Sequence, residues 1–263
     1  MIYDVVIIGG GIIGCMTARE LSRYRLNVAV LEAGNDAAVG ATKANSAIVH
    51  AGFDAKVGSL KAKLNVQGAK MMPKVCDELG VSYSNNGALV LGFSDEDRLV
   101  LEELLTRGRN NGVEGLQILN RTALMGLEPN IGEEVAYALY APTSGIVCPY
   151  GLAIAAMGNA MDNGVELYRN FEVDRIKRTE EGFEIYSDER VLSSRRVINA
   201  AGVCSDQIAK MVGDDSFEIT PRRGEYVLLD RSCGRLVKHT LFQTPSKLGK
   251  GILVTPTVDG NLS

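Results

Sequence analysis

The stretch that most constrains the fold is "DVVIIGGGIIGCMTARELSRYRLNVAVLEAG", residues 4 to 34. It opens with Asp4 to Ile8, an almost wholly apolar run that suits a central strand of a parallel sheet, buried on both faces. A glycine-rich turn, an amphipathic segment and a second apolar run at Val28 to Leu31 follow. This order predicts a strand, a tight turn, a helix and a second strand, which is a unit that binds dinucleotides.

The turn has GxGxxG spacing, formed by Gly9, Gly11 and Gly14. The first glycine permits the tight bend, the second lets the backbone approach a pyrophosphate, and the third lets the helix pack on the strand. The helix N-terminus then offers free N–H groups and a favourable dipole to the anion. Glu32, at the end of the second strand, is expected to accept hydrogen bonds from ribose hydroxyls and to repel the 2′-phosphate of an NADP-type ligand.

The helix after the turn is expected to bury an apolar side, formed by Ile12, Ile13, Met16 and Leu21. Cys15 follows the last glycine, at a place where a thiolate could be stabilised. A small residue that only packs is the simpler interpretation of Cys15.

The composition excludes several classes of protein. The 263 residues are 46% hydrophobic and 23% charged, as in ordinary globular chains, and the net charge of −4 is not gathered in blocks. We therefore expect neither nucleic acid as a partner nor a transmembrane segment. The five cysteines have no CxxC pair, so we expect no metal site and a cytoplasmic protein, with peripheral attachment at the inner membrane left open.

The next segment distinguishes FAD from NAD. "GNDAAVGATKANSAIVHAGFDAKVGSLKAKL" is rich in small residues, which let the backbone lie close to a flat ligand. Thr42, Asn45 and Ser46 offer two hydroxyls and an amide for phosphate and ribityl groups. A second GxGxxG, which would indicate an NAD(P)H site, is absent from the sequence, since "LGKGILV" lacks the last glycine. The electrons are therefore expected to come from the substrate.

The sequence resembles the FAD-dependent oxidoreductases of the D-amino-acid oxidase superfamily. It is most similar there to the glycerol-3-phosphate dehydrogenases and the L-2-hydroxyglutarate oxidases. The motifs that carry the resemblance keep the family order along the whole chain: "IIGGGIIG", "ATKANSAIVHAG", "GSLKAKL", "SGIVCPYGL", "VINAAGVCSD", "RRGEYVLLD" and "LVTPTVDGN". The resemblance implies an α/β fold, with a Rossmann-like FAD-binding domain that includes a β-meander and an α+β substrate domain with an antiparallel sheet.

The resemblance also implies positions for the cofactor. Gly9, Gly11, Gly14 and Glu32 would bind the ADP half of FAD, and Thr42, Asn45 and Ser46 would lie along its pyrophosphate and ribityl chain. Val173 in "NFEVDRI" matches the position whose backbone meets the adenine, and Gly202 in "NAAG" matches a turn beside the cofactor.

The chain is expected to form two domains. Residues 1–80 and 145–213 are assigned to the FAD-binding domain, with a helix that ends at Gly164, a β-meander and a last parallel strand at Arg196 to Ala200. Residues 81–144 and 214–263 are assigned to the substrate domain. Because family members continue beyond "ILVTPTVDGNLS", we expect this chain to be truncated and the substrate domain to be incomplete.

The substrate domain is expected to contain a strand at "GALVLGF" and a capped amphipathic helix at "SDEDRLVLEELLTRGRNNG". The helix would turn Leu99, Leu101, Leu104 and Leu105 inward. The segments "GEYVLLD", "HTLFQTP" and "GILVTPT" are expected to be strands of an antiparallel sheet.

Oxidation of a secondary alcohol requires a group that takes the hydroxyl proton, with a pKa near the working pH. His50 and His239 are the two histidines. In the family "SAIVHAG" reaches the flavin ring region, so His50 is a candidate base or flavin contact, and a purely structural histidine remains open. His239 opens an expected strand and is interpreted as structural, although in the family a histidine of the second domain can also contact the substrate.

An anionic substrate also needs cations and hydrogen-bond donors. Arg223 directly precedes the "GEY" strand that faces the active site in the family, and Tyr226 is part of that strand. Both are candidates, together with Arg222, Lys56 and Lys61. Solvent-facing charge, or strand packing for Tyr226, is the alternative interpretation.

The resemblance predicts an enzyme that oxidises a small anionic hydroxy compound, most of all glycerol 3-phosphate, by hydride transfer to FAD. An L-2-hydroxyglutarate oxidase or dehydrogenase, an amino-acid or amine oxidase of the same superfamily, and a non-catalytic flavin-binding module remain alternatives. The sequence does not identify the electron acceptor.

Overall fold

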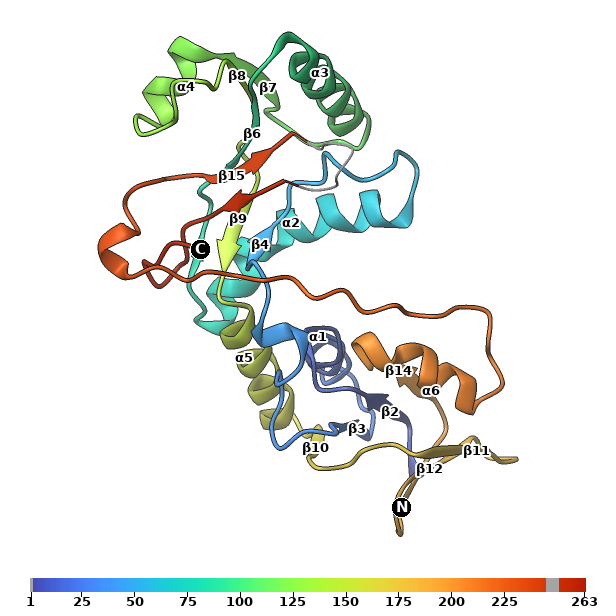
Figure 1. Cartoon of the computed structure of the whole chain (residues 1–263). Helices are drawn as coiled ribbons and strands as arrows, with labels where there is room; N and C mark the ends of the chain where they lie inside the picture. The colour runs from blue at the N-terminus through green and yellow to red at the C-terminus, as the bar shows by residue number, and fades with distance from the viewer. Residues whose placement is uncertain (1, 245–250) are drawn as a thin grey trace. The chain divides into compact units, whose positions relative to one another are not determined.

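The computed structural model describes residues 2–244 and 251–263. The chain forms two compact units, both discontinuous in sequence (Figure 1). The first contains Met1–Asn45 and Pro149–Gly224, and the second contains Ser46–Cys148 and Glu225–Ser263. Within the described residues, no helix combines the length and the apolarity that crossing a membrane requires.

A four-stranded parallel sheet lies at the centre of the first unit. Its strand order is β10 (Glu166–Tyr168), β3 (Val28–Leu31), β2 (Val5–Ile8) and β14 (Val197–Asn199). Every residue of β2 and β3 is buried, as their apolar runs predict. Two helices, α1 (Ile12–Leu21) and α5 (Pro149–Asp162), pack against each other in this unit.

The expected β-meander is confirmed. The strands β11 (Arg175–Arg178), β12 (Phe183–Ser187) and β13 (Arg190–Ser194) run antiparallel, and β1 (Ile2–Tyr3) pairs parallel with β13. The chain then enters β14 and forms a 3₁₀ turn, η2 (Gly202–Cys204), and the helix α6 (Ser205–Met211).

The expected buried side of α1 is wrong in part. The buried residues of α1 are Gly14, Cys15 and Ala18, whereas Ile13 is 66% exposed. These residues are small because α1 packs closely on α5, whose buried face contains Ala153, Ala156 and Ala160.

A five-stranded sheet forms most of the second unit. Its order is β16 (Leu253–Val254), β15 (Thr240–Gln243), β6 (Ala88–Gly92), β8 (Tyr137–Ala141) and β7 (Gln117–Asn120). Two helices follow strands of this sheet, α3 (Asp95–Asn110) after β6 and α4 (Arg121–Leu127) after β7.

A smaller three-stranded sheet completes the second unit. It contains β4 (Ile48–Val49), β9 (Gly145–Val147) and β5 (Tyr83–Ser84). The other elements of the chain are the 3₁₀ turn η1 (Ala41–Lys43) in the first unit, and the helix α2 (Leu60–Leu79) and the 3₁₀ turn η3 (Arg231–Cys233) in the second.

The strand at "GALVLGF" and the capped helix after it are confirmed as β6 and α3. Ser94 caps α3 by accepting a hydrogen bond from Asp97 N–H, and Leu101 and Leu104 are buried. Leu99 was expected inside but is 63% exposed, because the buried face of α3 is set by Leu101, Leu104 and Gly108.

The expectation for the C-terminal strands is only partly correct. "HTLFQTP" forms β15, although β15 runs parallel to β6, and "GILVTPT" forms β16, which is antiparallel to β15. "GEYVLLD" is not a strand. Among the described residues, the bridge between Leu229 and Leu262 is the single strand-like pairing of that segment, so it lacks the neighbours that a strand requires.

The division of the chain also differs from the expected domains, because residues 46–80 lie in the second unit. Two sets of contacts hold them there. Ile48 and Val49 pair with β9. Asn111, at the end of α3, donates hydrogen bonds from Nδ2 to Gly52 O at 3.0 Å and to Ala55 O at 2.8 Å.

Candidate functional site

The glycine turn of the first unit has the geometry that its spacing predicts. Gly9 has a φ of 110°, which favours glycine, and a Cβ there would collide with Ala200 O at the end of β14. A Cβ at Gly14 would collide with Gly9 O, so only glycine lets α1 begin this close to the turn. Gly11 is the N-cap residue of α1, where helix N–H groups are open to a ligand.

Glu32 joins two backbone segments beside this turn. Its Oε2 accepts a hydrogen bond from Gly10 N–H at 2.7 Å, and its Oε1 accepts one from Gly34 N–H, also at 2.7 Å. A carboxylate oxygen can accept more than one hydrogen bond, so both oxygens retain capacity for ribose hydroxyls. The carboxylate therefore orients the loop and remains suited to a sugar.

A cavity of about 320 Å³ opens at the carboxyl end of this sheet. Six residues expected at the cofactor line it together: Gly9, Gly11, Glu32, Thr42, Val173 and Gly202. Within residues 2–244 and 251–263, no hydrogen bond engages the backbone N–H or C=O of Val173, which leaves both groups available to a ligand. The cavity therefore suits a nucleotide whose base meets the backbone and whose diphosphate meets the helix.

The three polar residues of the "ATKANS" segment differ in their surroundings. Thr42 is buried, and its hydroxyl oxygen accepts a hydrogen bond from Ile12 N–H at 3.0 Å, so it caps an open N–H group of α1. Asn45 donates from Nδ2 to Ala41 O and Thr42 O and so holds the η1 turn. Neither Asn45 nor Ser46 is among the residues that line the cavity, and their contact with a cofactor stays a prediction.

Several lining residues were not expected from the sequence. Phe171, Cys204, Gln207 and Met211 also face the cavity. The guanidinium of Arg190 lies over the Phe171 ring at 4.6 Å from its centroid, which holds this aromatic wall. Their positions follow from the loop after β10, from η2 and from α6, and local sequence patterns did not mark them.

Cys15 is a packed thiol. It is buried, and its Sγ donates to Gly10 O at 3.2 Å. Burial, with a smaller contribution from the Glu32 carboxylate, raises the pKa of Cys15 to about 11. This favours the packing interpretation over a stabilised thiolate.

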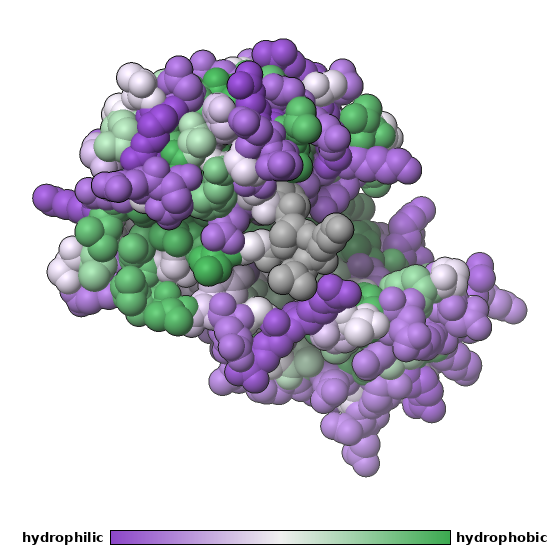
Figure 2. All heavy atoms as spheres, turned by 45° about the horizontal axis from the view of Figure 1, so that its top comes forward, coloured by the Kyte–Doolittle hydropathy of each residue, from purple (hydrophilic) through white to green (hydrophobic). Residues whose placement is uncertain are grey.

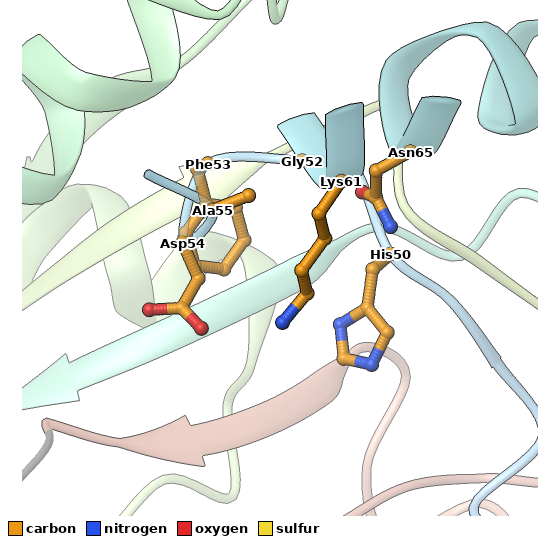
Figure 3. A pocket seen from close by; sticks show the side chains of 7 residues that line it. All are labelled: His50, Gly52, Phe53, Asp54, Ala55, Lys61 and Asn65. Atoms are coloured by element: carbon orange, nitrogen blue, oxygen red, sulfur yellow. The ribbon is translucent and has the colours of Figure 1, made fainter. Parts of the chain in front are cut away.

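The second unit holds a separate small pocket around His50 (Figure 3). Figure 3 shows the His50 imidazole, the Lys61 amine and the Asp54 carboxylate directed into this pocket of about 70 Å³. A second cavity of about 70 Å³ shares His50 and is also lined by Phe242 and Gln243 of β15. The His50 ring stacks on Phe242, with ring centroids 5.8 Å apart and an interplanar angle of 30°. His50 therefore shares its pocket with two charged side chains and stacks on an aromatic ring.

The loop that carries this pocket is held by α3. Besides the two hydrogen bonds from Asn111, Arg107 donates from Nη1 to Asp54 O at 3.3 Å. A Cβ at Gly108 would lie 2.8 Å from Phe53 Cβ, so glycine at this position lets the loop approach the helix. A rigid element thus positions the His50 loop.

His239 forms a hydrogen bond with a buried carboxylate of the second unit. Its Nδ1 lies 2.7 Å from Oε1 of Glu128, and both residues are buried. Burial opposes ionisation of Glu128, but hydrogen bonds from His239 and Lys238 outweigh it, so the pKa of the Glu128 carboxyl lies below its ordinary value.

Arg223 and Tyr226, the substrate candidates at the "GEY" segment, lie in different units. Arg223 belongs to the first unit and Tyr226 to the second, and both are exposed in a segment without helix or strand. Figure 2 shows hydrophobic residues at the molecular surface, and the exposed hydrophobic residues of the chain include Tyr226 and its neighbours Val227 and Leu228. Substrate contacts of Arg223 and Tyr226 stay predictions.

Together, the parallel sheet, its glycine turn, the Glu32 carboxylate and the β-meander define a two-unit flavoprotein of the dinucleotide-binding class. Comparison with known proteins identifies the family. The family described as FAD dependent oxidoreductase (DAO) matches residues 4–263, and the chain belongs to it. FAD is accordingly the cofactor of its class, and the lining of the first-unit cavity suits the ADP half of that group.

Three relatives illustrate the similarity. The chain is 48% identical over 260 residues to a glycerol 3-phosphate dehydrogenase from Caloramator mitchellensis, covering 99% of this chain and 54% of the relative. It is 31% identical over 279 residues to a mitochondrial L-2-hydroxyglutarate dehydrogenase from Nematostella vectensis, covering 99% and 61%. The solved structure of dithionite-reduced L-α-glycerophosphate oxidase from Mycoplasma pneumoniae, with FAD bound, matches with a TM-score of 0.92 and 32% identity, covering 100% and 70%. The chain thus spans about half the length of the Caloramator enzyme.

Proposed function

We propose that this chain is the FAD-binding part, with a portion of the substrate domain, of an enzyme that oxidises glycerol 3-phosphate. The observation that carries the proposal is the 48% identity over 260 residues to a glycerol 3-phosphate dehydrogenase. FAD, when bound, supplies the acceptor for the hydride that leaves the hydroxyl-bearing carbon of the substrate.

The first unit would hold the ADP half of the cofactor. The N–H group of Gly11 and those of the first turn of α1 that Thr42 does not cap would face the diphosphate, and Glu32 would accept hydrogen bonds from the ribose. The free N–H and C=O of Val173 would pair with the adenine edge. This assignment is supported by the common cavity that these residues line.

We further propose that His50 takes the hydroxyl proton of the substrate. An imidazole titrates near neutral pH, and the pocket around His50 contains Lys61, a cation suited to an anionic substrate. Arg223 and Tyr226 are the other proposed contacts of the substrate's anionic group. An unchanged rate of flavin reduction in His50→Ala would contradict the proposed base role of His50.

Anaerobic reduction of the flavin tests the substrate. The longer parent protein, loaded with FAD, is mixed with glycerol 3-phosphate, with L-2-hydroxyglutarate or with glycine, and bleaching of the oxidised flavin is followed. We expect fast bleaching with glycerol 3-phosphate alone. Bleaching by glycine alone would support an amine oxidase, and no bleaching by any of them would support a non-catalytic flavin module.

L-2-Hydroxyglutarate is the second candidate substrate. It is favoured by the 31% identity to the Nematostella dehydrogenase over nearly the whole chain, and it is also a small anionic secondary alcohol. Preferential bleaching by L-2-hydroxyglutarate would replace the first proposal with this one.

We also propose a reducing, cytoplasmic location. All five cysteines are free in the structure, which is usual for proteins of that compartment.

A further inference from the structure

A buried carboxylate outside the proposed site collects three hydrogen bonds on a single oxygen. Glu128, which is 1% exposed, accepts at Oε1 from Lys238 N–H at 2.7 Å, from His239 N–H at 2.6 Å and from His239 Nδ1 at 2.7 Å. His239 is itself only 9% exposed. Charge-assisted hydrogen bonds of this kind are stronger than neutral ones, so the neutral amide oxygen of a glutamine would hold the same three donors more weakly.

This carboxylate connects the end of one element to the start of another. Glu128 is the C-cap residue of α4, and Lys238 and His239 directly precede β15. Thr240, the first residue of β15, is also fixed from the other side, because its hydroxyl lies 2.9 Å from that of Thr255. The place where β15 begins is therefore set by buried polar groups.

The same strand carries the aromatic support of His50. Phe242 pairs in register with Val90 of β6 and stacks on the His50 ring. Phe242 lies three positions after His239, within the short strand β15, so a displacement of the start of β15 would move the Phe242 ring with it. Glu128, His239, Phe242 and His50 all belong to the second unit.

We propose that Glu128 is a positioning residue for His50: by fixing the start of β15 through His239, it sets the Phe242 ring against which His50 stacks. Its effect on catalysis rests on the proposed function of His50, whereas its effect on the position of His50 does not.

NMR of the histidine rings tests the proposal on the chain itself, without cofactor. With only two histidines in the sequence, the ring signals of His50 and His239 are readily assigned. Phe242→Leu removes the stacked ring and defines the His50 shifts without ring current. We expect Glu128→Gln to move the His50 signals toward their positions in Phe242→Leu. In the double variant Glu128→Gln with Phe242→Leu, the His50 signals should stay where Phe242→Leu alone places them.

One outcome of this experiment would contradict the proposal. If Glu128→Gln lowers the thermal midpoint but leaves the His50 signals at their wild-type positions, Glu128 is only a stabilising residue and the proposal is wrong. Asp206→Asn is the matched control, because Asp206 is a buried carboxylate of the first unit and should leave both histidines unchanged.

A second pair of variants covers the case in which Glu128→Gln does not fold. His239→Asn retains a side-chain N–H donor near the Nδ1 position, and His239→Leu removes it. We expect the His50 signals to stay in place in His239→Asn and to move in His239→Leu, and unmoved signals in both would overturn the proposal. In the FAD-loaded parent protein, Glu128→Gln should slow flavin reduction without changing FAD affinity. If no substrate reduces the flavin at all, the proposed function fails while the NMR result still decides the role of Glu128.

Discussion

Glu32 shows how a single side chain can serve both the fold and a ligand. It holds Gly10 and Gly34 through one oxygen each and lines the cavity beside them. Sequence position predicted the ribose contact, but it did not predict the two backbone hydrogen bonds, because Gly10 and Gly34 meet only after the β2–α1–β3 unit has folded.

Substitution Glu32→Gln should therefore weaken FAD binding and destabilise the first unit together. The amide nitrogen of glutamine would face a backbone N–H of Gly10 or Gly34, and one acceptor would be lost. We expect a loss of about 1–3 kcal/mol in FAD binding, a factor of roughly 5 to 150 in Kd, measured by flavin fluorescence titration. Glu172→Gln, at another acidic residue that lines the cavity, is the control and should change the Kd little. An unchanged Kd in Glu32→Gln would contradict the ribose assignment.

The Glu128 carboxyl makes the free energy of unfolding of the second unit depend on pH. Its pKa is lowered in the folded chain, so its contribution is fully present above the pKa of an unfolded glutamate, about 4.3, and is lost as the pH falls through the lower folded pKa. We expect the free energy of unfolding by urea to fall in this window in the wild type and to fall less steeply in Glu128→Gln. Equal slopes in the two proteins would rule out this contribution.

Two cysteines of the first unit should differ in reactivity. Cys15 is buried with a pKa raised to about 11, mainly by burial, so at neutral pH it stays a protected thiol. Cys204 is exposed and lines the cavity. With iodoacetamide, mass spectrometry should find Cys204 modified and Cys15 unmodified, and saturating FAD should slow the modification of Cys204. Equal labelling with and without FAD would argue against a cofactor in this cavity.

At the scale of secondary-structure elements, two glycines in helices predict opposite effects of the same substitution. Gly158 in α5 is exposed, and a Cβ there would meet nothing within 4 Å, whereas at Gly108 in α3 it would collide with Leu116 and approach Phe53. Gly158→Ala should stabilise the first unit by about 0.5–1 kcal/mol. Gly108→Ala should destabilise the second by about 1–3 kcal/mol, and the two changes in thermal midpoint should have opposite signs.

Elements with a strong local pattern could be predicted from the sequence, and those that depend on a distant neighbour could not. The buried runs of β2 and β3, the glycine turn and the Ser94 cap each carry their own signal. Ile13 was expected inside because the hydrophobic pattern of α1 does not reveal that α5 requires small residues at the contact. "GEYVLLD" has the composition of a strand, but composition does not supply a pairing partner.

At the scale of the whole molecule, each unit is assembled from two separate stretches of chain. The cavity of the first unit is lined by residues from β2, the Glu32 loop and α6, so a ligand bound there joins both stretches. At one hundred times its Kd, FAD should stabilise that unit by about 2.7 kcal/mol. Hydrogen exchange should then slow in β2, β3 and β14 and stay unchanged in β7 and β8. Uniform slowing over the whole chain would show that the two units unfold as one.

The pairing of β2 with β14 also has a consequence for synthesis. The glycine turn leaves the ribosome early, but β2 gains its second neighbour only when residues 197–199 have been made, and α6 follows later still. Between these events the nascent chain must accommodate residues 46–148, which belong to the other unit. The newly made N-terminal strands therefore wait with one edge uncovered, and a chaperone that shields this edge would protect the chain until β14 has been made.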